Sequence, residues 1–133
     1  MTDQVTSIEQ SKRLIKMGVP ADKASMVWHT MPAVIGRSKL QIAEEGHVGW
    51  MCRNFPGQYA PAFTVADLLG LLPPKISCQD PSDGNFRMRR YMGENGIEWV
   101  VDYDRFIAND VSIINVLVEA IILLVSTKHE LNI

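Results

Sequence analysis

The feature that most constrains the fold is the apolar run at residues 111–125. Its few polar positions recur at helical spacing and fall on one narrow stripe, formed by Ser112, Asn115, Glu119 and, just beyond the run, Ser126. The rest of the circumference is aliphatic, so a helix beginning near Asn109 or Asp110 must be buried on more than one side. We expect it to run through the middle of the fold or to bury a second face against another copy in a homodimer. The run is shorter than the roughly 20 residues of a membrane span, so no membrane is expected.

The N-terminal part of the chain carries the signals of a short helix. Ser7 and Gln10 have the spacing of a capping box, in which each side chain bonds to the backbone of the other residue. Gly18 can adopt the left-handed conformation that commonly ends a helix. We predict a helix between Ser7 and Gly18, followed by a second short helix over residues 21–28.

Residues 31–61 have the least regular pattern, because prolines and glycines interrupt every long run. Residues 40–42 alternate apolar with polar, and residues 48–52 are apolar. These two segments predict a loose hairpin around a Glu-Glu-Gly turn. Thr64 is then placed to cap a short, mostly buried helix that ends before Pro73.

The clearest local signal is a β-hairpin at residues 85–103. Two strand-like runs flank the sequence Gly-Glu-Asn-Gly, whose Asn-Gly pair favours a type I′ turn. Because side chains alternate between the faces of a strand, Trp99 is expected on the buried face with Arg90 over its ring. The same alternation places Arg87 and Asp102 on the other face, which we expect to be solvated.

Together these elements predict an α+β fold in one domain over residues 1–133. Helices pack on a small antiparallel sheet that contains the hairpin 85–103, and the long C-terminal helix lies buried across it. The net charge of -2 argues against a dedicated duplex-DNA binder, which usually has an excess of basic residues. Cys52 and Cys78 have no metal-ligand spacing, and we expect both thiols to be reduced.

The strand at residues 86–91 holds the one local concentration of positive charge. Arg87, Arg89 and Tyr91 share a face, and guanidinium groups beside an aromatic ring suit single-stranded nucleic acid. The acidic residues Glu98 and Asp102 fall on the same face of the neighbouring strand, so cross-strand ion pairs explain the arginines without a ligand. We favour the ion pairs, and nucleic acid is an unlikely partner.

Trp28, His29 and Trp50 are the candidates for a pocket or an interface, although tryptophans more often belong to a core or its rim. The chain has no recognisable nucleophile motif, phosphate-binding loop or metal-ligand spacing. We therefore expect no catalytic residue, no metal and no cofactor, while scattered residues could still build the site of a small hydrolase.

The chain resembles small uncharacterised proteins of gut Bacteroides-type bacteria and their phages or integrated elements. The segments that carry the resemblance are Ser7 to Gly18, Pro20 to Asp22, Pro61 to Val65, Leu68-Leu69, Leu72-Pro73, and Trp99 to Tyr103 before the terminal helix. These segments are helix caps and apolar spacings rather than a catalytic signature. That family has no established activity, so the resemblance implies a genomic context and no site residues.

We therefore expect a small cytoplasmic interaction or accessory protein of phage or mobile-element origin. It would act by binding a protein partner or a second copy of itself. The alternatives are a binder of single-stranded nucleic acid through the arginine-rich strand and a small hydrolase without a recognisable motif.

Overall fold

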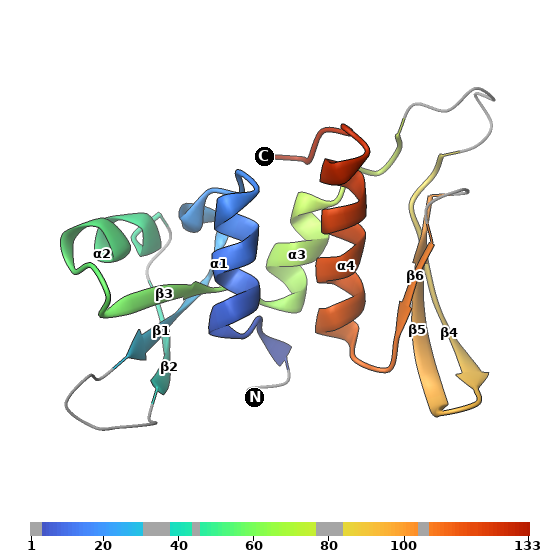
Figure 1. The fold of residues 1–133 in the computed structure, drawn as a ribbon, viewed down its shortest axis with the longest axis horizontal. Helices are drawn as coiled ribbons and strands as arrows, with labels where there is room; N and C mark the ends of the chain where they lie inside the picture. The colour runs from blue at the N-terminus through green and yellow to red at the C-terminus, as the bar shows by residue number, and fades with distance from the viewer. Residues whose placement is uncertain (1–3, 31–37, 44–45, 77–83, 104–106) are drawn as a thin grey trace. The chain divides into compact units, whose positions relative to one another are not determined.

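The computed structural model describes residues 4–30, 38–43, 46–76, 84–103 and 107–133. This part of the chain contains four α-helices and two three-stranded antiparallel sheets, so the predicted α+β class is confirmed (Figure 1). The chain divides into two compact units, one of residues 1–67 with residue 133 and the other of residues 68–132. None of the described helices is long and apolar enough to cross a membrane.

Helix α1 (Ile8–Lys16) begins and ends as predicted. The Ser7 hydroxyl accepts from the Gln10 amide at 3.1 Å, and the Gln10 side chain accepts from the Ser7 amide at 2.9 Å, which completes the capping box. At the other end Gly18 has a φ of 104°, and the Val19 amide donates to the Leu14 carbonyl at 3.1 Å. This is the Schellman closure, and it buries both Val19 and Leu14.

The predicted helix over residues 21–28 is wrong. Only a 3-10 turn, η2 (Ala21–Lys23), forms there, and the chain then enters strand β1 (Met26–Thr30). Strand β1 is the centre of a sheet with β2 (Ser38–Ile42) on one side and β3 (Tyr59–Ala62) on the other. The aromatic and β-branched residues of β1 suit a strand that pairs on both sides, and this pairing outweighs the local helical spacing.

The predicted hairpin over residues 40–52 is half wrong. Residues 40–42 do lie in a strand, but β2 pairs with β1, with Leu40 opposite Trp28. Residues 48–52 belong instead to helix α2 (Val48–Asn54). The two glutamates of the expected turn lie outside the described residues. Strand β3, which was not predicted, accommodates Pro61 because an edge strand needs fewer amide donors.

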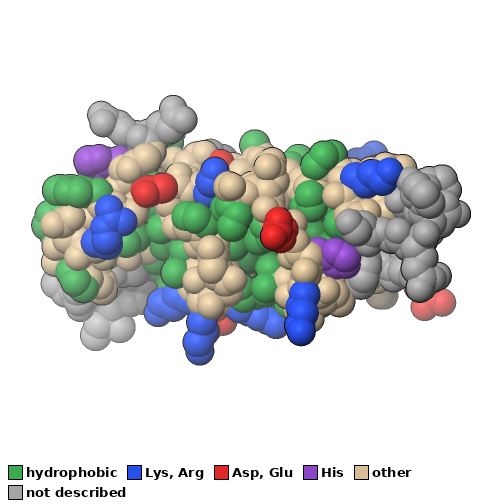
Figure 2. Space-filling model, turned by 90° about the horizontal axis from the view of Figure 1, so that it is seen from above, with side chains coloured by type: hydrophobic (Ala, Val, Ile, Leu, Met, Phe, Trp, Pro, Cys, Tyr) green, Lys and Arg blue, Asp and Glu red, His purple; other side chains and the backbone are tan. Residues whose placement is uncertain are grey.

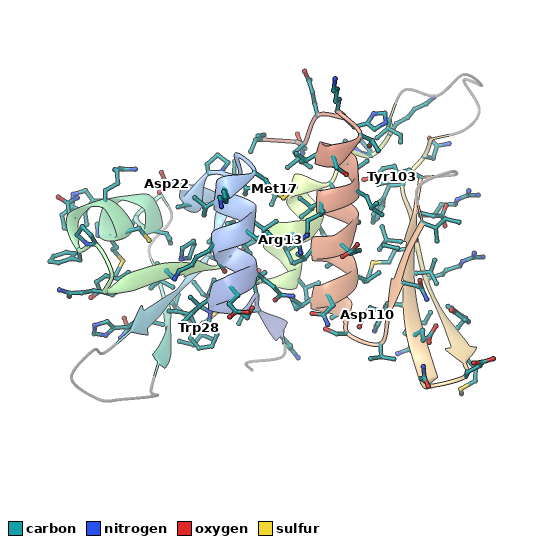
Figure 3. The ribbon with its side chains drawn as sticks, in the orientation of Figure 1. Arg13, Met17, Asp22, Trp28, Tyr103 and Asp110 are labelled. Atoms are coloured by element: carbon teal, nitrogen blue, oxygen red, sulfur yellow. The ribbon has the colours of Figure 1, made fainter. Side chains whose placement is uncertain are left out.

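A buried cluster of hydrogen-bonded polar groups connects the segment before α1 to the chain after β3. Thr6 exchanges hydrogen bonds with Phe63: the Thr6 amide donates to the Phe63 carbonyl and the Phe63 amide to Thr6 Oγ1, each at 2.9 Å. The buried Ser11 hydroxyl lies 2.6 Å from Thr6 Oγ1. The Trp28 indole donates to the Thr6 carbonyl at 2.9 Å (Figure 3). Each buried polar group in this cluster therefore has a partner.

Helix α3 (Val65–Leu71) begins at Thr64 as predicted and contains the division between the two units. The Asp67 amide donates to Thr64 Oγ1 at 3.1 Å, and the Thr64 amide donates to an Asp67 carboxylate oxygen at 2.9 Å. This reciprocal pair is again a capping box. Leu68 and Leu71 are buried, while Leu69 remains exposed.

The predicted hairpin is confirmed as β4 (Arg87–Gly93) and β5 (Gly96–Asp102), which form a sheet with β6 (Ile107–Asp110) in the order β4-β5-β6. The turn is not type I′, because positive φ occurs at Gly96, with 102°, and not at Asn95. A Gly in the left-handed region after two turn residues is the pattern of a type I turn with a bulge. Strand β6 was missed, because the helix was expected to begin where this strand lies.

Helix α4 (Ile113–Ser126) packs against β5 and β6, and it is buried on more than one side as predicted (Figure 1). Its N-cap is Ser112, whose hydroxyl accepts from the Asn115 amide at 3.2 Å. Its exposed residues are Asn115, Glu119 and Ser126, which belong to the expected polar stripe. The aliphatic residues of this helix are buried or half-buried.

Candidate functional site

Five aromatic side chains of the first unit form a continuous row along α2, the connection to β3, and the β1–β3 pair. Along the row, the ring centroids of His47 and Trp50 are 4.9 Å apart, those of Trp50 and Phe55 5.9 Å, and those of Phe55 and Tyr59 5.8 Å. Tyr59 then stacks on His29 at 4.7 Å, with ring planes 16° apart. We call these five residues the aromatic row.

The aromatic row lies at the surface. Trp50 is 45% exposed to solvent and Phe55 is 40% exposed, and the other three residues of the row are half-buried. Figure 2 shows hydrophobic and histidine side chains reaching the surface at the left of the view, where α2 lies. Exposed tryptophan and phenylalanine rings in contact with each other are the kind of apolar surface that commonly binds a partner.

Different elements position the rings. His47 and Trp50 are three residues apart at the start of α2, so they project from neighbouring positions of one helical turn. Tyr59 lies directly opposite His29 in the β3–β1 register, which brings these two rings together. Phe55, the C-cap of α2, contacts both Trp50 of the helix and Tyr59 of the strand.

The start of α2 is held by a residue from another element. The N-cap His47 makes no side-chain capping bond, and the Gly49 amide instead donates to Asp22 Oδ1 at 2.7 Å. Asp22 belongs to η2, so this carboxylate ties η2 to the helix that carries Trp50 (Figure 3). A Cβ on Gly49 would lie 2.7 Å from the same oxygen, so the close approach depends on glycine.

The electrostatics of α2 follow from the same contact. Burial and, to a smaller extent, the nearby Asp22 carboxylate raise the pKa of the Cys52 thiol, and Arg53 acts in the opposite direction. A raised pKa keeps Cys52 protonated and a poor nucleophile near neutral pH. The helix therefore offers ring surface rather than a reactive thiol.

Of the three predicted pocket or interface residues, the structure brings two together and separates the third. His29 and Trp50 belong to the aromatic row. Trp28 neighbours His29 in β1 and so faces the other side of the sheet, where it packs against Val5, Met26 and Ala62. Three members of the aromatic row were not predicted: His47, Phe55 and Tyr59. The frequency of aromatic residues between positions 47 and 59 was a signal that could have indicated them.

Cross-strand contacts engage part of the arginine-rich strand, and the expected ion pair is present for Arg87. Arg87 donates to Asp102 at 3.0 Å, and the Tyr91 hydroxyl donates to Glu98. The hydrogen bond to Glu98 is the main cause that raises the pKa of Tyr91. Arg89 lies opposite Val100, which has no charge to offer. The structure thus places Arg87, Arg89 and Tyr91 on one face, with two of the three already engaged.

One expectation about this face is wrong. Asp102 was expected to be solvated, but its side chain is only 8% exposed, whereas that of Arg87 is 65% exposed. On the opposite face, the Arg90 guanidinium carbon lies 5.4 Å from the centre of the Trp99 ring, which is the expected cation–π contact.

The second unit has an open pocket of about 550 Å³ between residues 73–76 and 128–132. Its lining includes Lys75, Lys128 and Glu130, so its charges partly cancel. Among the described residues, no three His, Cys, Asp or Glu side chains are grouped closely enough to hold a metal ion.

No protein-family model, curated protein or solved structure matches the chain. The resemblance to small proteins of Bacteroides-type bacteria and their phages therefore gains no support from these comparisons and stays a prediction.

Proposed function

We propose that this protein acts by binding, as a small interaction or accessory protein, and that the aromatic row is its contact surface. The observation that carries the proposal is the unbroken contact of five rings, of which Trp50 and Phe55 are substantially exposed. Large aromatic side chains dominate the energetics of protein interfaces. The phage or mobile-element origin is part of the same proposal and rests on the resemblance described above.

The chemistry of the row favours an uncharged, extended partner, and we take a proline-rich peptide as the ligand class. Rings provide flat surfaces for pyrrolidine rings, and the polar tips of Trp50, Tyr59 and the two histidines can donate to carbonyls. A polyproline II segment has no internal hydrogen bonds, so its carbonyl groups are free to accept. Grooves lined by aromatic residues recognise such segments in several unrelated domains.

The test is a titration of the protein with a synthetic proline-rich peptide. Tryptophan fluorescence and amide chemical shifts are measured at each peptide concentration. We expect shifts at residues 47–59, and we expect Trp50→Ala and Phe55→Ala each to weaken binding at least about fivefold. Ile42→Ala is the matched control, because Ile42 is 84% exposed in the same unit but outside the row. Circular dichroism verifies that each variant is folded.

The proposal is wrong if the peptide produces no shifts at millimolar concentration, or if Trp50→Ala binds as tightly as the unchanged protein. Bases also stack on exposed rings, so a single-stranded oligonucleotide is titrated in parallel. Binding of the oligonucleotide alone, weakened by the same two substitutions, would retain the row as the contact surface and replace the ligand class.

A further inference from the structure

Strand β4 lies at an edge of the second unit's sheet. Its seven residues pair with β5 on one side, and no strand of the described chain pairs with the other side (Figure 1). An edge strand presents a row of backbone amides and carbonyls that an extended peptide can complete as an additional strand. The hydrogen bonds of such an addition supply affinity, and the side chains flanking the edge supply specificity.

The charged residues of β4 itself are all basic. Strand β4 contains Arg87, Arg89 and Arg90 and no acidic residue. Arg87 is matched by Asp102, and Arg90 lies over Trp99, but Arg89 stands opposite an apolar residue of β5. Arg89 therefore has no charge directly opposite it in β5, and the Glu98 and Asp102 carboxylates on the same face are bonded to Tyr91 and Arg87.

The other face of the same edge is apolar near the hairpin turn. Met92 is 76% exposed and Ile97, directly opposite it, is 50% exposed. Met88, four residue pairs further along β4, is half-buried on the same face. One face of β4 thus carries Arg87 and Arg89, and the other carries Met88 and Met92 with Arg90, over Trp99, between them.

We propose that β4 binds an extended peptide in which acidic and apolar residues alternate, by adding it as a fourth strand to the sheet. Successive side chains of the added strand point to opposite faces, so its carboxylates would meet Arg89 and its apolar residues would meet Met88 and Met92. The inference concerns the second unit and does not depend on the function proposed for the aromatic row.

The geometry favours this occupant over two others. A second copy that paired through its own β4 would bring arginines against arginines, which opposes association. A nucleic-acid strand lying across the sheet face would meet Glu98 and Asp102 of β5 together with the arginines. An added strand lies about 4.8 Å from β4 and twice as far from β5. Arg87 and Arg89 are therefore close to it, while the Glu98 carboxylate lies over the turn end of β4, beside Gly93.

The experiment uses the full chain and a peptide of alternating Glu and Val, with a control peptide of the same composition in which the Glu and Val residues form separate blocks. Amide hydrogen exchange and chemical shifts report on residues 87–93. We expect the alternating peptide to slow exchange in β4 and the block peptide to have little effect. We expect affinity to fall as salt is raised, because exposed charges are screened.

Arg89→Glu should weaken binding about five- to tenfold, since it replaces attraction of a partner carboxylate by repulsion. Lys12→Glu is the matched control, because it makes the same charge change at an exposed position of α1 and should leave the affinity unchanged.

Three results would overturn the inference: no slowing of exchange in β4, equal losses for the two variants, or equal effects of the two peptides. Self-association through β4, or protection of β4 by an oligonucleotide and not by the peptide, would also overturn it and would identify the other occupant. A failure here leaves the aromatic row untouched, because none of these variants or measurements concerns residues 47–59.

Discussion

The contact between Asp22 and Gly49 predicts that the effect of Gly49→Ala on the stability of the protein changes sign when Asp22 is replaced. Gly49→Ala places a methyl group 2.7 Å from Asp22 Oδ1 and 2.9 Å from its Cγ, which is closer than van der Waals contact allows. The carboxylate must therefore move away from the Gly49 amide that it caps at 2.7 Å. In an Asp22→Ala background, the same methyl group meets no carboxylate.

Two opposing effects set the magnitude. Alanine is a better helix former than glycine by about 1 kcal/mol in a helix interior, and by somewhat less in a first turn. Loss of a capping acceptor costs about 1 kcal/mol, with a range of about 0.5–2. With Asp22 present, we expect Gly49→Ala to be neutral or destabilising by up to about 1 kcal/mol. In the Asp22→Ala background, we expect it to stabilise by about 0.5–1 kcal/mol, because the gain is no longer opposed.

The assay is urea unfolding of the unchanged protein, both single variants and the double variant, with amide exchange of residues 48–54 as a local measure of α2. Tryptophan fluorescence reports whether Trp50, the next residue after Gly49, has moved. The reasoning fails if Gly49→Ala has the same effect in both backgrounds, because the two positions would then not be coupled.

Three further predictions come from the second unit. Lys128 has a φ of 62° at the end of α4, where the His129 amide closes a Schellman motif, so Lys128→Gly should stabilise by about 1 kcal/mol in urea unfolding, while Lys128→Ala should change little. Burial raises the pKa of Tyr103 above its usual value near 10. Because Tyr103 therefore ionises in the unfolded chain before it ionises in the folded protein, the protein should lose stability as pH rises above about 10. Tyr103→Phe should reduce this loss in unfolding measured between pH 8 and pH 11. Arg87→Glu should destabilise by about 1–3 kcal/mol, whereas Arg89→Glu should stay within about 0.5 kcal/mol, and equal midpoints for the two would contradict the pairing described here.

The elements that could be predicted from sequence are those whose signals lie within a few residues. Ser7 and Gln10, or Thr64 and Asp67, satisfy each other across one turn, so the spacing alone indicates where α1 and α3 begin. The hairpin and the polar stripe of α4 are local in the same sense. Local patterns of this kind do not need knowledge of any distant partner.

The errors lie where distant partners decide the conformation. Residues 26–30 become a strand because β2 and β3, from elsewhere in the chain, pair with both of its sides. Residues 48–52 become a helix whose first turn is capped by Asp22, far away in the sequence. Neither partner is visible in the segment itself, so local periodicity was a poor guide at both places.

The contacts of the aromatic row also divide into those between residues close in sequence and those between distant residues. His47 and Trp50 are neighbours on a helix, and their spacing could have been read once α2 was known. His29 and Tyr59 meet only through the β1–β3 register, which the sequence pattern did not indicate. A binding surface assembled by strand pairing therefore remains hidden until the topology is known.

The outer face of the second sheet shows that alternation predicts direction but not burial. Arg87, Arg89 and Asp102 lie on the face where alternation places them, yet Asp102 is buried and Arg87 is exposed. A buried carboxylate needs a compensating charge, so Arg87 is required for the stability of the fold. Arg89, two residues further along β4, lies opposite Val100 and does not have this stabilising role. Two arginines that are equivalent in sequence thus have different roles, and only Arg89 can be exchanged to test binding without disturbing the fold.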